Sequence, residues 1–200
     1  GLGDVYKRQP SCTGILITNL GTPDEPTPSS VRKYLAEFLS DPRIIELPKY
    51  LWWFILHGII LRVRPSRSAK AYKKIWSESG SPLLSISKKQ VLGLEKILAE
   101  KVQGPIKIKL SMRYGNPSIK SGLNKLRELN ENRILILHLY PQYSAATTAS
   151  TFDAKTNAYP SSAPLLYKKS LIVKSEICTS PAMINALLSF VAPVGFIDVD

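Results

Sequence analysis

Short apolar runs alternate with longer amphipathic segments along most of the chain. Gly14 to Leu20 and Ile134 to Leu139 are apolar runs of strand length, whereas Ile106 to Met112 alternates apolar residues with lysines and a serine. Two further short strands are predicted at residues 44–47 and 170–173. Because helical periodicity separates these runs, the pattern predicts an α/β domain with a parallel sheet and crossover helices.

The helical segments carry start signals of their own. Thr27 is a predicted N-cap, Pro28 suits the first helical position, and apolar residues then recur at helical spacing through Leu39. Ser118 begins another amphipathic segment. Two more helices are predicted over residues 88–102 and 181–191.

Polar and aromatic residues follow two of the predicted strands. Arg113 and Tyr114 end one strand, while Tyr140, Tyr143 and Ser144 follow another. In an open α/β sheet, ligands bind at the edge formed by the carboxyl ends of the strands. We therefore expect these side chains to converge on one crevice.

The run LWWFILHGIIL, residues 51–61, is apolar on every helical face and too short to span a bilayer. Trp52 and Trp53 are adjacent and so point to different faces of a helix. The run leaves two interpretations equally open: a buried helix, or an exposed apolar lip that contacts a ligand, a partner or a membrane surface.

Basic residues follow this run, with no acidic residue between Leu47 and Ser77. Such a run is most often a solvated face. Beside an apolar surface, however, arginines such as Arg64 suit a flat apolar ligand with carboxylate edges, since guanidinium groups bind carboxylates bidentately. Nucleic acid is not expected, because no zinc-finger, helix-turn-helix or RNP-like spacing is present.

Hydroxyl and aromatic groups mark two later segments. Tyr72 precedes a Gly80-Ser81-Pro82 turn, in which the serine could cap a helix or meet a polar ligand edge. Five hydroxyl residues crowd the start of a predicted helix at residues 144–151, where free N–H groups attract anions. Helix capping accounts for one or two of these five hydroxyl groups, so five is more than capping requires.

Composition narrows the class of protein. The 200 residues are 44% apolar and carry a net charge of +12, which favours anionic partners. The phosphate-binding patterns G-x-G-x-x-G and G-x-x-x-x-G-K-[ST] are absent, so a nucleotide site has no motif support. Cys12 and Cys178 lack metal-ligand spacing and fit a reducing cytoplasm.

The two ends of the sequence do not match the rest. Residues 1–10, GLGDVYKRQP, fit no following element and resemble a translated adaptor scar, so we expect them to be non-native. The closing VGFIDVD begins like a strand and then stops. Both ends are expected to be those of a fragment.

Several motifs together resemble the ferrochelatase family. They are GILITNLGTPDEPT, VRKYLAEFLSDPRIIELP, LWWFILHGIILRVRP, YKKIWSESGSPLL, MRYGNPSI and LYPQYSAATTASTFDA, in the family's order and spacing. The resemblance implies a Rossmann-like, chelatase-type parallel sheet with helices on both faces, the first of two similar domains. It implies an N-terminal domain at residues 11–157, with 158–200 starting the connection to a second domain.

The resemblance also implies an activity, the insertion of Fe²⁺ into protoporphyrin IX or a related porphyrin such as coproporphyrin. The family's catalytic histidine, in an S-[FY]-H-G-[IL]-P segment, and its glutamate have no counterpart in this sequence. His57 lies in the apolar run. His138 is interpreted as a core histidine, because a lone imidazole lacks an orienting partner. The chain by itself is therefore expected to be inactive.

What the resemblance assigns to this chain is a substrate wall. Arg64 and Ser81 match positions suited to propionate carboxylates, and Tyr72 matches a position suited to packing or a hydrogen bond. Asn19 and Leu20 match a loop at the macrocycle face, Arg113 and Tyr114 a supporting pair opposite the catalytic histidine, and Trp52 and Trp53 the membrane or porphyrin lip.

No metal site or bound cofactor is expected in this part of the protein, and Fe²⁺ is a substrate. A cytoplasmic location with peripheral membrane contact is expected. The alternative function is a non-catalytic tetrapyrrole-binding or membrane-peripheral module.

Overall fold

A four-stranded parallel sheet forms the centre of the computed structural model, which describes residues 13–101, 105–129, 133–140, 144–158 and 171–174. The strand order is β2-β1-β3-β4. The strands are β1 (Thr13–Thr22), β2 (Ile106–Gly115), β3 (Arg133–His138) and β4 (Leu171–Lys174). The predicted α/β class with a parallel sheet is therefore confirmed.

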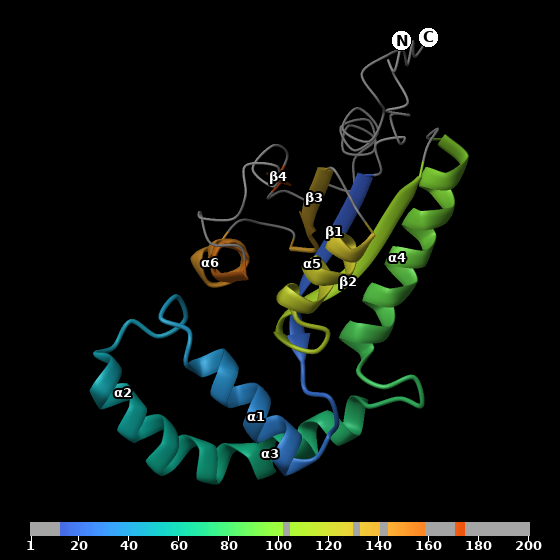
Figure 1. The fold of residues 1–200 in the computed structure, drawn as a ribbon. Coiled ribbons are helices and arrows are strands. Elements are labelled where there is room, and N and C mark those ends of the chain that lie inside the picture. Colours follow the sequence, from blue (N-terminus) through green and yellow to red (C-terminus); the bar gives the residue numbers. More distant parts are fainter. Residues whose placement is uncertain (1–12, 102–104, 130–132, 141–143, 159–170, 175–200) are drawn as a thin grey trace, which may run out of the picture.

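Helices cover both faces of this sheet (Figure 1). Helix α4 (Pro82–Lys101) packs through Val91 and Leu98 on one face, where it meets Ile15 and Ile17 of β1. On the opposite face, α5 (Ile119–Glu128) packs against the apolar residues of β1 and β3, and α6 (Ser150–Ala158) lies beside α5. The near-continuous apolar character of β1 and β3 follows, because both of their faces are covered.

A layer of helices lies beyond the carboxyl ends of the strands (Figure 1). Helix α1 (Pro28–Leu39) packs against α3 (Leu61–Ile75), and α2 (Lys49–Ile55) leads into α3 through the π-helical turn η1 (Leu56–Ile60). A second hydrophobic cluster joins them to Tyr114 at the end of β2. This helical layer brings the apolar and basic segments to the edge of the sheet formed by the carboxyl ends of its strands.

The start signals identified in the sequence match the structure. Thr27 caps α1 through a hydrogen bond from the Ser30 backbone N–H, and Ser118 caps α5 through the Ser121 N–H. Gly21, at φ +114°, lies so close to the next strand that a Cβ would overlap the Tyr114 carbonyl oxygen. Because residue 21 is a glycine, the ends of β1 and β2 can approach each other this closely.

Some predicted boundaries were wrong. Residues 44–47 form no strand, because the Asp41 carbonyl accepts hydrogen bonds from the Ile44 and Ile45 N–H groups and turns the chain. Helix α4 begins at Pro82, six residues before the predicted Lys88, since a proline suits a helix start.

Near the end of the chain, the structure describes few residues and so tests fewer of the predictions. Strand β4 confirms the predicted strand at 170–173 within one residue, and it pairs in parallel with β3. The predicted helix at 181–191, both cysteines, Tyr143 and residues 1–10 lie outside the described residues. The division after residue 157 stays a prediction.

Candidate functional site

A buried polar network joins the carboxyl end of β2 to two other segments. One carboxylate oxygen, Oδ2 of Asp41, accepts hydrogen bonds from Arg113 Nη2 at 2.6 Å, Tyr114 Oη at 2.7 Å and Ser150 Oγ at 2.5 Å. Arg113 Nε also donates to the backbone oxygen and the hydroxyl of Ser150, at 2.9 and 2.6 Å. Asp41 follows α1, and Ser150 begins α6. Three segments that are distant in sequence therefore meet at one carboxylate.

The electrostatics of the network favour an ionised Asp41. Burial alone raises the pKa of this carboxyl, but hydrogen bonds from Ser150, the Arg43 N–H and Tyr114, with the nearby Arg113 charge, lower it below its usual range. Burial raises the pKa of the Tyr114 phenol, which stays neutral. The Arg113 guanidinium carbon lies 4.4 Å from the centre of the Tyr114 ring, a cation–π arrangement.

A second ion pair links the same segments at the surface. Arg43 Nε lies 2.6 Å from Asp153 Oδ2, joining the turn after α1 to α6. The two side chains are 43% and 47% exposed, so this pair adds little stability by comparison with the buried network.

His138 is buried at the end of β3, as its interpretation as a core histidine predicted, with 1% of its surface exposed. The imidazole does have an orienting partner: its Nδ1 lies 2.6 Å from Thr18 Oγ1 on β1. Nε2, by contrast, has no hydrogen-bond partner among the described residues. Burial lowers the pKa of His138 to about 4, so the ring is neutral at pH 7.

The apolar run 51–61 presents a large exposed surface on α2 and η1. Trp53 is 55% exposed and Phe54 67% exposed, whereas Leu56 and Leu61 are buried against α1. Trp52 faces inward and donates a hydrogen bond from Nε1 to the Leu39 carbonyl at 2.6 Å. The structure therefore confirms that the two tryptophans face different ways. The run is buried on one side and exposed on the other, and the prediction that Trp52 belongs to an exposed lip was wrong, because its indole packs inward on the helical cluster.

We define the apolar lip by its exposed large residues on α2 and η1, which are Tyr50, Leu51, Trp53, Phe54 and Ile59. The imidazole of His57 also lies here, stacked on the Trp53 indole with ring centres 4.9 Å apart. Helix α3 continues directly from the lip and carries the exposed basic residues Arg62, Arg64, Arg67, Lys70, Lys73 and Lys74. Apolar and basic surfaces are thus contiguous.

The other predicted binding residues lie closer to the core. Leu20 and the half-buried Tyr72 pack on the same hydrophobic cluster as Tyr114, and burial raises the pKa of the Tyr72 phenol. Asn19 donates to Ser87 Oγ on α4 at 3.0 Å, and Ser81, 4% exposed, directly precedes that helix.

The hydroxyl-rich segment does not present all of its hydroxyls outward. The π-helical turn η2 (Ala145–Ala149) leads into α6, where Ser150 binds the Asp41 network and Thr151 donates to the Thr147 carbonyl. Ser144 is exposed, and its hydroxyl contacts that of Thr147. Only part of this segment therefore remains for a ligand.

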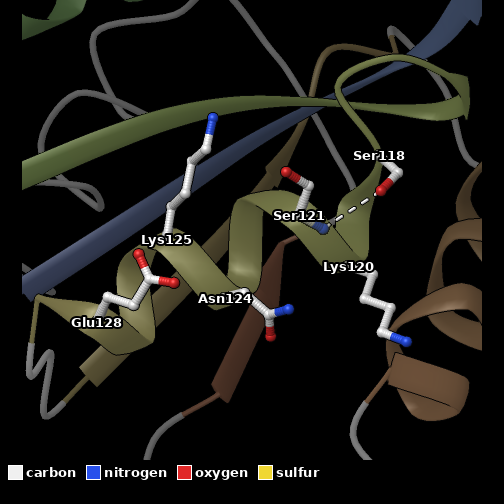
Figure 2. A pocket seen from close by; sticks show the side chains of 6 residues that line it. All are labelled: Ser118, Lys120, Ser121, Asn124, Lys125 and Glu128. Atoms are coloured by element: carbon white, nitrogen blue, oxygen red, sulfur yellow. Dashed lines mark hydrogen bonds between the residues drawn. The ribbon is translucent and has the colours of Figure 1, made fainter.

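A shallow pocket on the outer face of α5 is separate from this site (Figure 2). Its side chains project from the helix, and the one hydrogen bond drawn among them is the Ser118 cap. It is lined by Ser118, Lys120, Ser121, Asn124, Lys125 and Glu128. These residues form a solvated helix face without converging chemistry.

Neither a metal centre nor a membrane span is found in the ranges that the structure describes. Within them, no three histidine, cysteine or acidic side chains come together as a metal site. None of the helices described is both long and apolar enough to cross a bilayer.

The fold and candidate site define a class of α/β domain in which polar side chains gather at the carboxyl ends of parallel strands, the edge where open α/β sheets generally bind ligands. The family model for ferrochelatase matches residues 12–192. The ferrochelatase of Thioalkalivibrio sulfidiphilus is 56% identical over 153 residues, 76% of this chain and 42% of the relative. That of Marinobacter nauticus is 51% identical over 154 residues, 77% of this chain and 42% of the relative. The chain belongs to the ferrochelatase family, and its matched part spans about two fifths of these relatives' length.

Sequence reasoning missed Asp41 as a member of the site. Asp41 lies 72 positions from Arg113 and 109 from Ser150, so no local spacing relates them. The only signal was an acidic residue in an Asp-Pro turn directly after an amphipathic helix. The Thr18–His138 pair was missed for the same reason, because β1 and β3 pair only in the folded sheet.

Proposed function

We propose that this chain forms the N-terminal wall of the porphyrin-binding cleft of a ferrochelatase, which inserts Fe²⁺ into protoporphyrin IX or a related porphyrin such as coproporphyrin. The observation that carries the proposal is the exposed apolar lip continuing directly into the basic face of α3. A porphyrin is a flat apolar body with carboxylate edges, which matches this pairing of surfaces. Membership of the ferrochelatase family supports the same assignment.

The residues divide the work of binding. The exposed Trp53 and Phe54 rings bury apolar porphyrin surface, while Arg64 binds a propionate by charge-assisted hydrogen bonds. Tyr72 packs below this surface, and the Ser81 hydroxyl meets a second carboxylate. Asn19 and Leu20 form the floor at the end of β1.

Arg113 and Tyr114 form the part of the wall that faces the family's catalytic histidine. The Arg113 side chain is 16% exposed, so it can reach a ligand, whereas Tyr114 is fully buried. Tyr114 therefore acts through Arg113: its ring lies beside the guanidinium carbon, and its hydroxyl donates to the Asp41 carboxylate that also binds Arg113.

Metal insertion forms iron–nitrogen bonds and releases two pyrrole protons, so the complete enzyme needs a proton acceptor. We assign binding and orientation of the porphyrin to this chain, and proton removal to the family's histidine segment outside this sequence. His138 is excluded from that role because its ring is buried and held by Thr18.

The test uses a completed chain, in which this sequence continues into the remainder of the Thioalkalivibrio relative. We expect the completed chain to insert Fe²⁺ or Zn²⁺ into protoporphyrin, followed by product absorbance, and the 200-residue chain alone to show no insertion above background. Arg64→Ala should raise KM for porphyrin about tenfold, the usual cost of a lost charged hydrogen bond. Zinc-porphyrin formation by the chain alone, abolished by His138→Ala, would contradict both the proposal and the assignment of His138.

The second candidate is a non-catalytic tetrapyrrole-binding or membrane-peripheral module, which the exposed lip also favours. The completed chain distinguishes the two functions. A shift of the porphyrin Soret band without metal insertion would support the binding module. Sedimentation with anionic vesicles, lost on substitution of Trp53, would support peripheral contact at the cytoplasmic membrane surface.

A further inference from the structure

We propose that Asp41 is a positioning residue of the porphyrin site, acting through Arg113 and assisted by Ser150. The inference rests on the proposed function, in which Arg113 faces the porphyrin. Asp41 itself has only 5% of its side chain exposed and is turned into the protein. Any effect of Asp41 on the reaction must therefore pass through the groups that it binds.

The contacts of Arg113 fix its orientation from several sides. Nε is held by the backbone and hydroxyl oxygens of Ser150, Nη2 by Asp41, and the guanidinium carbon lies 4.4 Å from the centre of the Tyr114 ring. An unrestrained arginine samples many rotamers, and ordering it on binding lowers the affinity for a ligand. Here the network orders the side chain before a ligand binds.

Oδ2 of Asp41 is the shared acceptor of this network. It receives donors from β2 and α6 while Asp41 itself belongs to the turn after α1. The other carboxylate oxygen accepts the Arg43 N–H at 2.8 Å, which fixes the carboxylate plane. The position of the guanidinium group is thus set by the packing of three elements. A ligand that binds Arg113 is therefore held in a defined position as well.

A double-mutant cycle in the completed chain tests the inference. Asp41→Asn keeps the shape but removes the charge, and Arg113→Ala removes the group that is positioned. If Asp41 acts through Arg113, each single variant should lower kcat/KM about tenfold and the double variant should lose no more than Arg113→Ala alone. A double variant that loses the product of the two effects would overturn the inference.

Asp153→Asn is the matched control. It removes a carboxylate that joins the same turn to the same helix through the surface ion pair with Arg43, outside the buried network. It should leave kcat/KM within about twofold of the parent, as for an exposed ion pair. An effect as large as that of Asp41→Asn would show that joining the elements matters and positioning does not.

Folding and the proposed function are checked separately. Thermal unfolding of each variant sets an assay temperature at which all are folded. If Asp41→Asn does not fold, Ser150→Ala replaces it in the cycle. This variant removes the hydroxyl that donates to Asp41 Oδ2 and accepts from Arg113 Nε while keeping both charges, and the same additivity criterion decides. A folded parent without insertion activity contradicts the proposed function, whereas additive losses in an active parent contradict only the role of Asp41.

Discussion

At the scale of single residues, the fold favours the ionised form of one buried side chain and the neutral form of another. Asp41 is surrounded by donors and a positive charge, so its ionised form is favoured despite burial. The His138 ring is held by Thr18, and burial favours its neutral form. Both residues therefore make the stability of the protein depend on pH, and both destabilise it in acid by different routes.

The stabilising effect of ionised Asp41 should disappear in strong acid. Because its folded pKa is below the unfolded value, the contribution is complete above roughly pH 4 and is lost as pH falls through the folded pKa. Asp41→Asn should cost about 3 kcal/mol at pH 7, since it leaves the Arg113 charge without its partner. The difference in the free energy of unfolding between the parent and Asp41→Asn should become smaller below about pH 4, as measured by chemical unfolding across a pH series. A difference that stays constant to low pH would contradict this assignment.

His138 should act over a higher pH range. Its pKa falls from 6.5 to about 4 on folding, so the unfolded chain takes up a proton first and stability falls between those values. The free energy of unfolding should fall by on the order of 3 kcal/mol over this pH range. His138→Leu should flatten the stability profile between pH 6.5 and 4. An unchanged slope in this variant would place the titrating group elsewhere.

At the scale of elements, two helical glycines have opposite surroundings. Gly122 of α5 lies against the sheet, where a Cβ would overlap Ser111 Oγ and come within 2.7 Å of Leu16 Cδ1. A Cβ added at Gly93 of α4 would meet no neighbouring atom within 4 Å. Helix α5 can approach the sheet closely only because residue 122 has no side chain.

The same substitution should therefore have opposite effects at the two sites. Gly93→Ala should raise the free energy of unfolding by up to about 1 kcal/mol through helix propensity. Gly122→Ala should lower it by about 1–3 kcal/mol through overpacking. Ser111→Ala should partly rescue Gly122→Ala, because it removes the hydroxyl that the new methyl group overlaps. Equal effects of the two substitutions in urea unfolding would refute this account.

At the scale of the whole molecule, the helical layer beyond the sheet decides which apolar residues remain exposed. Trp52 packs on the cluster shared by α1 and α3, while its neighbour Trp53 extends the apolar lip. The two residues have the same chemistry and neighbouring positions. They form a matched pair for separating stability from binding.

Trp53→Ala should change stability by less than about 0.5 kcal/mol, as expected for an exposed side chain. In the completed chain it should weaken porphyrin binding, measured by Soret titration, because it removes an aromatic ring from the lip. Trp52→Ala should instead lower the melting temperature, since it removes buried surface and the hydrogen bond to the Leu39 carbonyl. A loss of binding with Trp52→Ala only, at a temperature where both variants are folded, would contradict the role of the lip.

Much of the fold was predictable because its signals are local. The strands at 14–20, 106–112 and 134–139, and the caps Thr27 and Ser118, depend on apolar runs and on hydrogen bonds within a few residues. The wrong strand at 44–47 shows the limit of this reasoning. Ile44 lies in a turn and packs against the helical layer, and no neighbouring strand among the described residues pairs with this segment.

The candidate site was predictable only as a location. The sequence by itself determined the parallel α/β sheet, the polar strand ends near Arg113 and the apolar run beside a basic segment, since periodicity and motif order encode these features. Only the tertiary structure decided that Trp53 is exposed, that His138 pairs with Thr18, and that Asp41 organises Arg113. Each of these depends on contacts between segments distant in sequence, and such contacts are set by the packing of elements rather than by any local pattern.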